Sequence, residues 1–188
     1  MSDAVRIGVL AVQGNFREHA AMLRRLGAEV VEVRVPAQLE GLDGLVVPGG
    51  ESTAISRLIR WYDLEEPIST FEGPLFGTCA GMILFDRDHL GLIDLSVERN
   101  AYGRQVASFE ADVELEGEET PLRGIFIRAP RVGAIGPGVE VLGRLHGDPV
   151  LVREGRVIAA SFHPELTDDT RVHGRFLEMV REVQGVRA

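Results

Sequence analysis

Cysteine is almost missing from this sequence: one residue of that type, Cys79, occurs among 188. One thiol cannot form an internal disulfide, and the lack of cysteine pairs argues against a structural zinc site. The five histidines are too dispersed along the chain to suggest another metal. We therefore expect no bound metal and no disulfide, and a single cysteine fits a reducing compartment.

Long hydrophobic runs are also missing. No segment reaches the roughly 18 apolar residues that a transmembrane helix needs. The short apolar run at residues 7–12 has no basic region before it and no small-residue cleavage site after it, so it does not resemble a secretory signal. The expectation is a cytoplasmic protein without a membrane span.

Positive charge is in the minority, since 20 basic side chains stand against 29 acidic ones for a formal net charge of −9. The basic residues are scattered, which argues against nucleic acid as a partner. No phosphate-binding loop of the Gly-Lys-Ser type occurs, so ATP has no predicted site. No cofactor is expected.

The length is that of one domain, and we expect a single domain over residues 1–188. In the first half, runs that are apolar on both alternating faces are each followed by a helical pattern, which indicates a parallel sheet covered on both sides. The predicted strands are residues 5–12, 29–35, 44–47 and 74–77. Asn15 and Ser52 are the predicted N-caps of the helices that follow the first and third strands.

The second half is rich in short strand-like runs. They cover residues 106–115, 124–128, 139–145, 150–153 and 157–162, and they favour antiparallel hairpins, with a hairpin loop at 117–121. A closing helix is predicted from the spacing of Val172, Phe176, Met179, Val180 and Val183. The predicted fold class is α/β, a three-layer, mostly parallel open sheet flanked by helices, with antiparallel strands in the C-terminal half.

Cys79 lies in the segment Phe76-Gly77-Thr78-Cys79-Ala80-Gly81, directly after a predicted strand. The two glycines would let the chain turn sharply into a helix and leave the sulfur exposed at the tip, as in a nucleophile elbow. Most free cysteines are instead small buried apolar residues. This hexapeptide alone does not decide between the two interpretations.

A second candidate follows the last predicted strand, in Ser161-Phe162-His163-Pro164-Glu165. Pro164 is expected to hold the backbone extended and to point the side chains of His163 and Glu165 the same way. Histidine can take a thiol proton near neutral pH, while a carboxylate on its other nitrogen fixes the tautomer. Such a tripeptide is usually a surface turn, but together with Cys79 it predicts a Cys-His-Glu triad.

A third candidate is Pro48-Gly49-Gly50-Glu51-Ser52, at the carboxyl end of a parallel strand, where open α/β sheets bind ligands. Its glycines leave backbone N–H groups unobstructed, and such groups could bind an oxyanion. The alternative is a tight strand-to-helix turn. The segment lacks the six-residue glycine pattern of dinucleotide-binding folds.

These three motifs, in this order and at this spacing, resemble the class I glutamine amidotransferases, whose triad is Cys-His-Glu and whose fold is flavodoxin-like. Three further segments resemble the glutaminase subunits of pyridoxal 5′-phosphate synthases, and this resemblance spans the whole chain. The segments are residues 8–14 with Arg17-Glu18-His19, residues 98–105 and residues 126–130.

The resemblance implies hydrolysis of L-glutamine to glutamate and ammonia. The ammonia would pass to a separate, barrel-shaped synthase subunit that makes pyridoxal 5′-phosphate, vitamin B6, within a hetero-oligomer. It also implies low activity until the synthase docks, with a flip of the backbone around Gly49 and Gly50 and with Gln13 near the interface.

The roles carried over by this resemblance are a nucleophile at Cys79, a general acid/base at His163 and an orienting carboxylate at Glu165. Backbone N–H groups of Gly50 and Ala80 are expected to bind the oxyanion. The positions that match glutamine-binding residues are Gly50, Glu51, Ser52, Arg99, Ile127 and Arg128. An arginine fork suits the α-carboxylate of glutamine.

The chain departs from the family pattern in two places. Only four residues separate Leu84 from His89, so the loop after the elbow helix is expected to be short. Tyr102 stands where phenylalanine is common. Three other functions stay open: a glutaminase for a different synthase, such as one in histidine biosynthesis, a redox-sensing or chaperone-like elbow-cysteine protein, and a catalytically dead binding subunit.

Overall fold

The structure, a computed structural model, describes residues 4–99 and 108–187. Tyr102, most of the 98–105 segment and the start of the strand expected at 106–115 lie outside the described residues.

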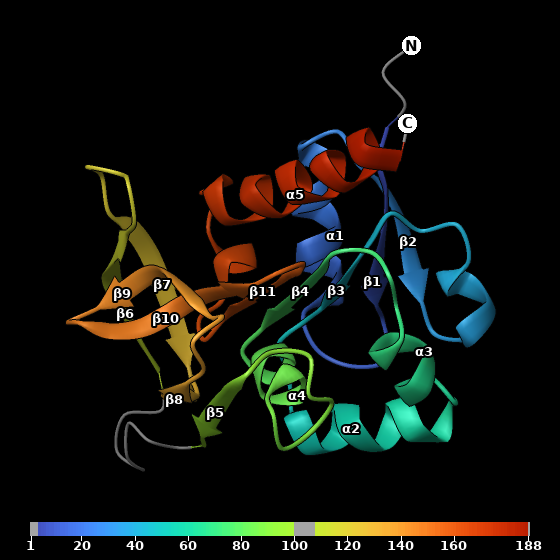
Figure 1. Cartoon of the computed structure of the whole chain (residues 1–188), viewed down its shortest axis with the longest axis horizontal. Helices are drawn as coiled ribbons and strands as arrows, with labels where there is room; N and C mark the ends of the chain where they lie inside the picture. Colours follow the sequence, from blue (N-terminus) through green and yellow to red (C-terminus); the bar gives the residue numbers. More distant parts are fainter. Residues whose placement is uncertain (1–3, 100–107, 188) are drawn as a thin grey trace.

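A mixed sheet forms the centre of the described chain, with nine strands in the order β2-β1-β3-β4-β11-β10-β9-β6-β7 (Figure 1). The five strands at one end pair in parallel, as the sequence predicted. They are β2 (Glu29–Val33), β1 (Arg6–Leu10), β3 (Gly44–Val47), β4 (Leu75–Thr78) and β11 (Val157–Ala160). The α/β class is confirmed.

The other end of the sheet is antiparallel, which confirms the hairpins predicted for the second half. Its strands are β10 (Asp148–Glu154), β9 (Glu140–Leu145), β6 (Ser108–Leu115) and β7 (Leu122–Ile127). A small second sheet pairs β5 (Leu95–Glu98) with β8 (Arg131–Ile135). The sequence did not predict these two strands, because each is short and they belong to no long apolar run.

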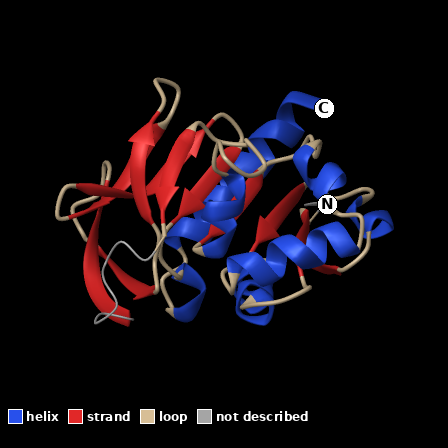
Figure 2. Ribbon diagram, turned by 90° about the horizontal axis from the view of Figure 1, so that it is seen from below, coloured by secondary structure: helices blue, strands red, loops and turns tan. Residues whose placement is uncertain are grey.

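Helices cover both faces of the parallel strands, as Figures 1 and 2 show. One face carries α1 (Phe16–Arg25) and α5 (Arg171–Arg187), and the other carries α2 (Ser52–Trp61), α3 (Glu65–Ser69) and α4 (Ala80–Phe85). Two short 3-10 turns, η1 (Pro36–Leu39) and η2 (Pro164–Leu166), complete the described elements. The predicted three layers are therefore present.

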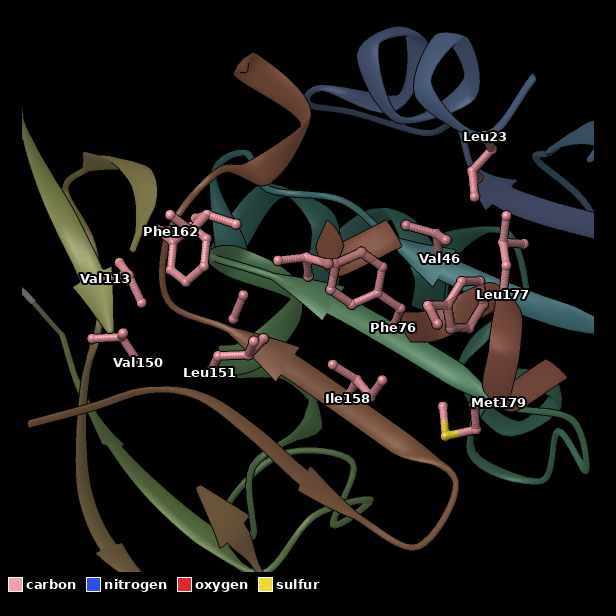
Figure 3. Close-up of a cluster of buried hydrophobic side chains, with 14 of the residues drawn as sticks. Leu23, Val46, Phe76, Val113, Val150, Leu151, Ile158, Phe162, Leu177 and Met179 are labelled. Carbon is pink, nitrogen blue, oxygen red and sulfur yellow. The ribbon is translucent and has the colours of Figure 1, made fainter. Parts of the chain in front are cut away.

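Alternation along the strands explains why both faces are buried. In β3, Val46 belongs to the apolar cluster under α1 and α5, while its neighbours Leu45 and Val47 belong to the cluster over α2 and α4. Successive side chains of a strand point to opposite faces, so a strand that is apolar throughout fills two cores. Figure 3 shows part of the first cluster, from Val46 and Phe76 of the sheet to neighbouring helix side chains.

One of the two predicted N-caps is confirmed in position: Asn15 is the N-cap residue of α1, whereas Ser52 is not the N-cap of α2. Asn15 precedes α1 but makes no capping hydrogen bond with its side chain. At α2 the cap is Glu51 rather than Ser52, because the two carboxylate oxygens of Glu51 accept the N–H groups of Thr53 and Ala54 at 3.0 and 2.7 Å. A negative side chain at a helix N-terminus is also favoured by the helix dipole.

Within the described ranges, no helix is both long enough and apolar enough to cross a membrane.

Candidate active site

Cys79 forms the turn between β4 and α4, with backbone φ 50° and ψ −102°. This left-handed φ is costly for a residue with a side chain and is typical of functional turns. Gly81 makes the turn possible, since a Cβ at that position would overlap the carbonyl oxygen of Val47 in β3. The predicted elbow is present, but the thiol is buried, with Cys79 only 6% exposed.

The thiol is covered by the end of β7. Cys79 Sγ lies 3.7 Å from the carbonyl oxygen of Ile127, to which the thiol donates. The next residue, Arg128, also has a positive φ of 45°. The β7 end therefore places two of the predicted glutamine-binding residues directly beside the nucleophile, and this cover explains why the sulfur is not exposed as expected.

His163 and Glu165 meet behind the sulfur, with 2.7 Å between His163 Nδ1 and Glu165 Oε1. The expected extended backbone is wrong, because Pro164 begins the 3-10 turn η2 and that turn brings Glu165 back onto His163. Proline suits the first position of a helix, where its missing N–H is not needed. The two side chains thus converge as predicted, through a different backbone conformation.

The charges of this pair support each other. Burial opposes ionisation of Glu165, but the facing His19 and the hydrogen bond from His163 lower its pKa to about 2. Burial alone would lower the pKa of His163; hydrogen bonds to Cys79 and Glu165 raise it to about 10. Because Nδ1 is assigned to the carboxylate it faces, Nε2 is the nitrogen left for the thiol of Cys79.

Cys79 and His163 line a pocket of about 540 Å³. The predicted glutamine-binding residues line it too: Gly50, Glu51, Ser52, Arg99, Ile127 and Arg128. Sequence reasoning did not place Gly14, Asn15 and Ile83 here, and it assigned Gln13 only to a partner interface. A larger cavity of about 650 Å³ beside α5 contains none of the predicted site residues.

The glycine pair packs tightly against the triad. A Cβ at Gly49 would overlap His163 Cε1 and lie 3.2 Å from Cys79 Cβ, and one at Gly50 would overlap Gln13 Oε1. The N–H of Gly49 donates to Thr78 Oγ1 at 3.0 Å. The oxyanion role of the Gly50 and Ala80 N–H groups stays a prediction.

Glu51 contributes backbone rather than a free carboxylate to the pocket. Its side chain caps α2, and the hydrogen bonds from Thr53 and Ala54 lower its pKa. Its N–H donates to Gln13 Oε1 at 3.0 Å. Gln13 therefore fixes the turn that carries Gly50, a contact between distant segments that sequence spacing does not reveal.

Arg99 is supported by the short loop after α4. Its Nη2 lies 3.4 Å from His89 Nε2, and His89 Nδ1 lies 2.7 Å from the buried carboxylate of Asp86. The predicted loop is thus compact, and it places one histidine between a carboxylate and a pocket arginine.

In the part of the chain that the structure describes, no group of three or more histidine, cysteine, aspartate or glutamate side chains could hold a metal ion.

The mixed α/β sheet and the cysteine elbow backed by a histidine and a carboxylate define the glutamine amidotransferase class of protein. The chain belongs to the SNO glutamine amidotransferase family, whose model matches residues 9–182. The family resemblance drawn from the motifs is therefore confirmed.

Relatives match over nearly the whole chain. A Thermus thermophilus protein named pyridoxal 5′-phosphate synthase subunit PdxT is 56% identical, over 92% of this chain and 96% of its own length. A Thermosipho africanus protein of the same name is 52% identical, over 95% of this chain and 100% of its own. A solved crystal structure of a glutamine amidotransferase has a TM-score of 0.87 at 52% identity, covering 93% of this chain and 98% of that one.

Proposed function

We propose that this chain is the glutaminase subunit of a pyridoxal 5′-phosphate synthase and works as one glutaminase domain over residues 1–188. The observation that carries the proposal is the approach of the Cys79 elbow and the His163–Glu165 pair beside a single pocket. The names of relatives more than half identical support the choice of synthase.

The first half of the reaction makes a thioester. Cys79 Sγ attacks the side-chain amide carbon of glutamine from the form of the pair in which the thiol proton is already on His163 Nε2, the form that the raised pKa of His163 favours. The carbonyl oxygen becomes an oxyanion, which the N–H groups of Gly50 and Ala80 stabilise by about 3 kcal/mol for each donor. The carbon–nitrogen bond then breaks, His163 returns the proton to the leaving nitrogen, and ammonia departs from a γ-glutamyl thioester.

The second half regenerates the Cys79–His163 pair. His163 takes a proton from water as the water oxygen attacks the thioester carbon, and the carbon–sulfur bond breaks. The proton stays on His163 Nε2 beside the released sulfur of Cys79, and glutamate leaves. Glu165 stays ionised throughout, because its role is to hold the imidazole and stabilise its protonated form.

The pocket matches glutamine at its charged end. The guanidinium of Arg99 can take the α-carboxylate through two parallel hydrogen bonds. Arg128, the backbone at Ile127 and the turn at Gly50, Glu51 and Ser52 line the rest of the space beside the sulfur. We assign glutamine binding to these residues.

Ammonia needs an acceptor, and we propose that it passes to a barrel-shaped synthase subunit in a hetero-oligomer in the cytoplasm. Docking would raise activity by setting the backbone around Gly49 and Gly50. Glutaminase rates measured with and without the synthase check this; equal rates contradict the activation.

The central test is Cys79→Ala, assayed for glutamate release with the synthase present. We expect no turnover, with an unchanged circular dichroism spectrum and melting temperature. Pyridoxal phosphate formation by the mixture should persist when ammonium chloride replaces glutamine. Retained glutaminase turnover in this variant would refute the assignment of the nucleophile.

A chloroketone analogue of glutamine separates a glutaminase from a redox or chaperone protein, since it should label Cys79 selectively only in a glutaminase. The synthase that co-purifies from the native host distinguishes vitamin B6 synthesis from another ammonia-using pathway. A synthase of histidine biosynthesis in that complex would overturn the vitamin B6 proposal.

A further inference from the structure

Three fully buried polar side chains form a chain behind the triad: His19 of α1, His173 of α5 and Thr78 of β4. His19 Nδ1 lies 2.9 Å from His173 Nε2, and His19 Nε2 lies 2.9 Å from Thr78 Oγ1. Thr78 Oγ1 in turn accepts the N–H of Gly49. The network therefore links two helices to the strand and the glycine turn that flank the nucleophile.

The same imidazole faces the triad carboxylate. His19 Nε2 lies 3.4 Å from Glu165 Oε2, the oxygen that His163 does not use. Among the described residues, Glu165 Oε2 and His173 Nδ1 are buried without a hydrogen-bond partner. Burying polar atoms is costly unless they are paired, so the proton positions in this network matter.

Burial favours the neutral form of both histidines. Burial lowers the pKa of His19 and lowers that of His173 to about 3. The charged and titratable groups that act on His19 are Glu165, His163 and Glu18, and those that act on His173 are His19, Glu165 and Arg25. A neutral imidazole carries one donor and one acceptor, so each ring has one proton to place.

The surroundings assign those protons. A bare Nε2 on His19 would turn its lone pair toward the ionised Glu165, so the proton belongs on Nε2. Nδ1 of His19 is then an acceptor, and His173 must donate from its Nε2. This leaves His173 Nδ1 as a bare acceptor, which agrees with its lack of a partner, since an unpaired buried N–H is the rarer defect.

We propose that His19 is a positioning residue for the triad: held by His173 as the Nε2–H tautomer, it donates to Thr78 and presents the same proton edge to Glu165. His19 then acts on three features of the site. It fixes Thr78, the residue before the nucleophile, and through Thr78 the turn at Gly49. It also faces Glu165 Oε2, the second oxygen of the orienting carboxylate. The expected effect on kcat rests on the proposed glutaminase function. The proton positions of His19 and His173 do not depend on that function.

The first test reads the tautomers directly. In the full-length protein labelled with ¹⁵N-histidine, long-range ¹H–¹⁵N spectra show which ring nitrogen of each of the five histidines carries a proton. We expect protonation at Nε2 for both His19 and His173 at pH 7. A proton on His19 Nδ1 overturns the proposal.

The second test compares His173→Gln with His173→Leu. The two side chains are similar in size, but only glutamine keeps an N–H donor for His19 Nδ1. With the synthase present, we expect kcat for glutamine hydrolysis to be about tenfold lower in the leucine variant than in the glutamine variant, with KM within about twofold. Equal kcat values in two folded variants overturn the proposal, even if the leucine variant melts at a lower temperature.

Two further measurements keep the outcomes separate. If His173→Leu does not fold, Thr78→Val and Thr78→Ser replace the first pair of variants. Valine removes the hydroxyl that His19 contacts and serine keeps it, and we expect the same difference in kcat between them. Alkylation of Cys79 by iodoacetamide needs neither glutamine nor synthase. It should be slower in His173→Leu than in His173→Gln, and slower in Thr78→Val than in Thr78→Ser. A wild-type protein without glutaminase activity refutes the proposed function, whereas equal alkylation rates refute the role of His19.

Discussion

The side-chain amide of Asn15 lies 3.3 Å from Glu165 Oε1, the oxygen that also contacts His163 Nδ1 at 2.7 Å. Asn15 Nδ2 is the donor in its contact and Glu165 the acceptor, across 150 positions of sequence. The turn after β1 therefore completes the carboxylate end of the triad. Asn15 is the N-cap residue of α1, but its side chain makes no capping hydrogen bond and contacts Glu165 instead.

We predict that Asn15→Asp lowers kcat more than Asn15→Ala does. Alanine only removes a donor, whereas aspartate places a second carboxylate against Glu165 and raises the pKa of one of the two carboxyl groups. We expect a loss of about tenfold for alanine and about a hundredfold for aspartate, equivalent to about 1.4 and 2.7 kcal/mol. Steady-state glutaminase kinetics with the synthase measure it, and an aspartate variant as active as the wild type would contradict the contact.

Gly49→Ala is predicted to reduce activity strongly, because the new methyl group would overlap the His163 ring. The matched control is Gly174→Ala in α5, where a Cβ meets no other atom within 4 Å. Alanine in a helix is favoured over glycine by about 1 kcal/mol, so the control should raise the melting temperature and keep its activity. Thermal melting and glutaminase assays of the pair check this, and the prediction fails if the two variants behave alike.

His89→Leu should raise KM for glutamine severalfold while leaving kcat nearly unchanged. The variant removes the acceptor that holds Arg99 and leaves the triad intact. Arg99→Lys should have a larger effect on KM, because lysine cannot bind a carboxylate through two parallel bonds. The control on the same loop is Arg87→Gln, which breaks an exposed ion pair with Asp94 of the kind worth little. A rise in KM as large for Arg87→Gln as for His89→Leu would remove the special role of His89.

The sequence allowed the elbow and the parallel sheet to be predicted because both are local patterns. Glycines around Cys79 and apolar runs such as the one in β3 carry their information within a few residues. The meeting of Cys79 and His163 was predicted from the coincidence of the two motifs and from the family resemblance, without a physical reason for their approach. Their positions at the carboxyl ends of neighbouring strands β4 and β11 now give the physical reason.

What escaped prediction depends on contacts between distant segments. Glu51 caps α2 in place of Ser52 because of its exact backbone placement, and η2 replaces an extended segment at Pro164. The contact of His19 with His173 joins residues 154 positions apart. Neither histidine lies in a sequence pattern that distinguishes a buried hydrogen-bond network from the ordinary buried face of a helix. Spacing along one chain carries no signal for such pairs.

The titration of the buried groups predicts how stability depends on pH. Glu165 has a lowered pKa, so its contribution is full above its ordinary value of 4.5 and is lost as the pH falls toward about 2. His163 has a raised pKa, so its contribution is full below 6.5 and is lost as the pH rises through about 10.

His173 acts in the opposite sense to His163 and gives the sharpest prediction. Its pKa falls from 6.5 to about 3 on folding, so the unfolded chain binds a proton that the folded chain excludes, and stability drops as the pH falls below 6.5. Replacing it with leucine removes this loss. Between pH 7 and pH 4 the stability of His173→Leu relative to the wild type should therefore improve by about 3 kcal/mol.

Chemical denaturation at several pH values measures that change. His146→Asn is the control, because His146 is exposed and asparagine tolerates its positive φ of 49°. The control should follow the wild type across the whole range. If the stability difference between His173→Leu and the wild type stays constant from pH 7 to pH 4, His173 is not buried in its neutral form, and the proton assignment of the network beneath Cys79 fails with it.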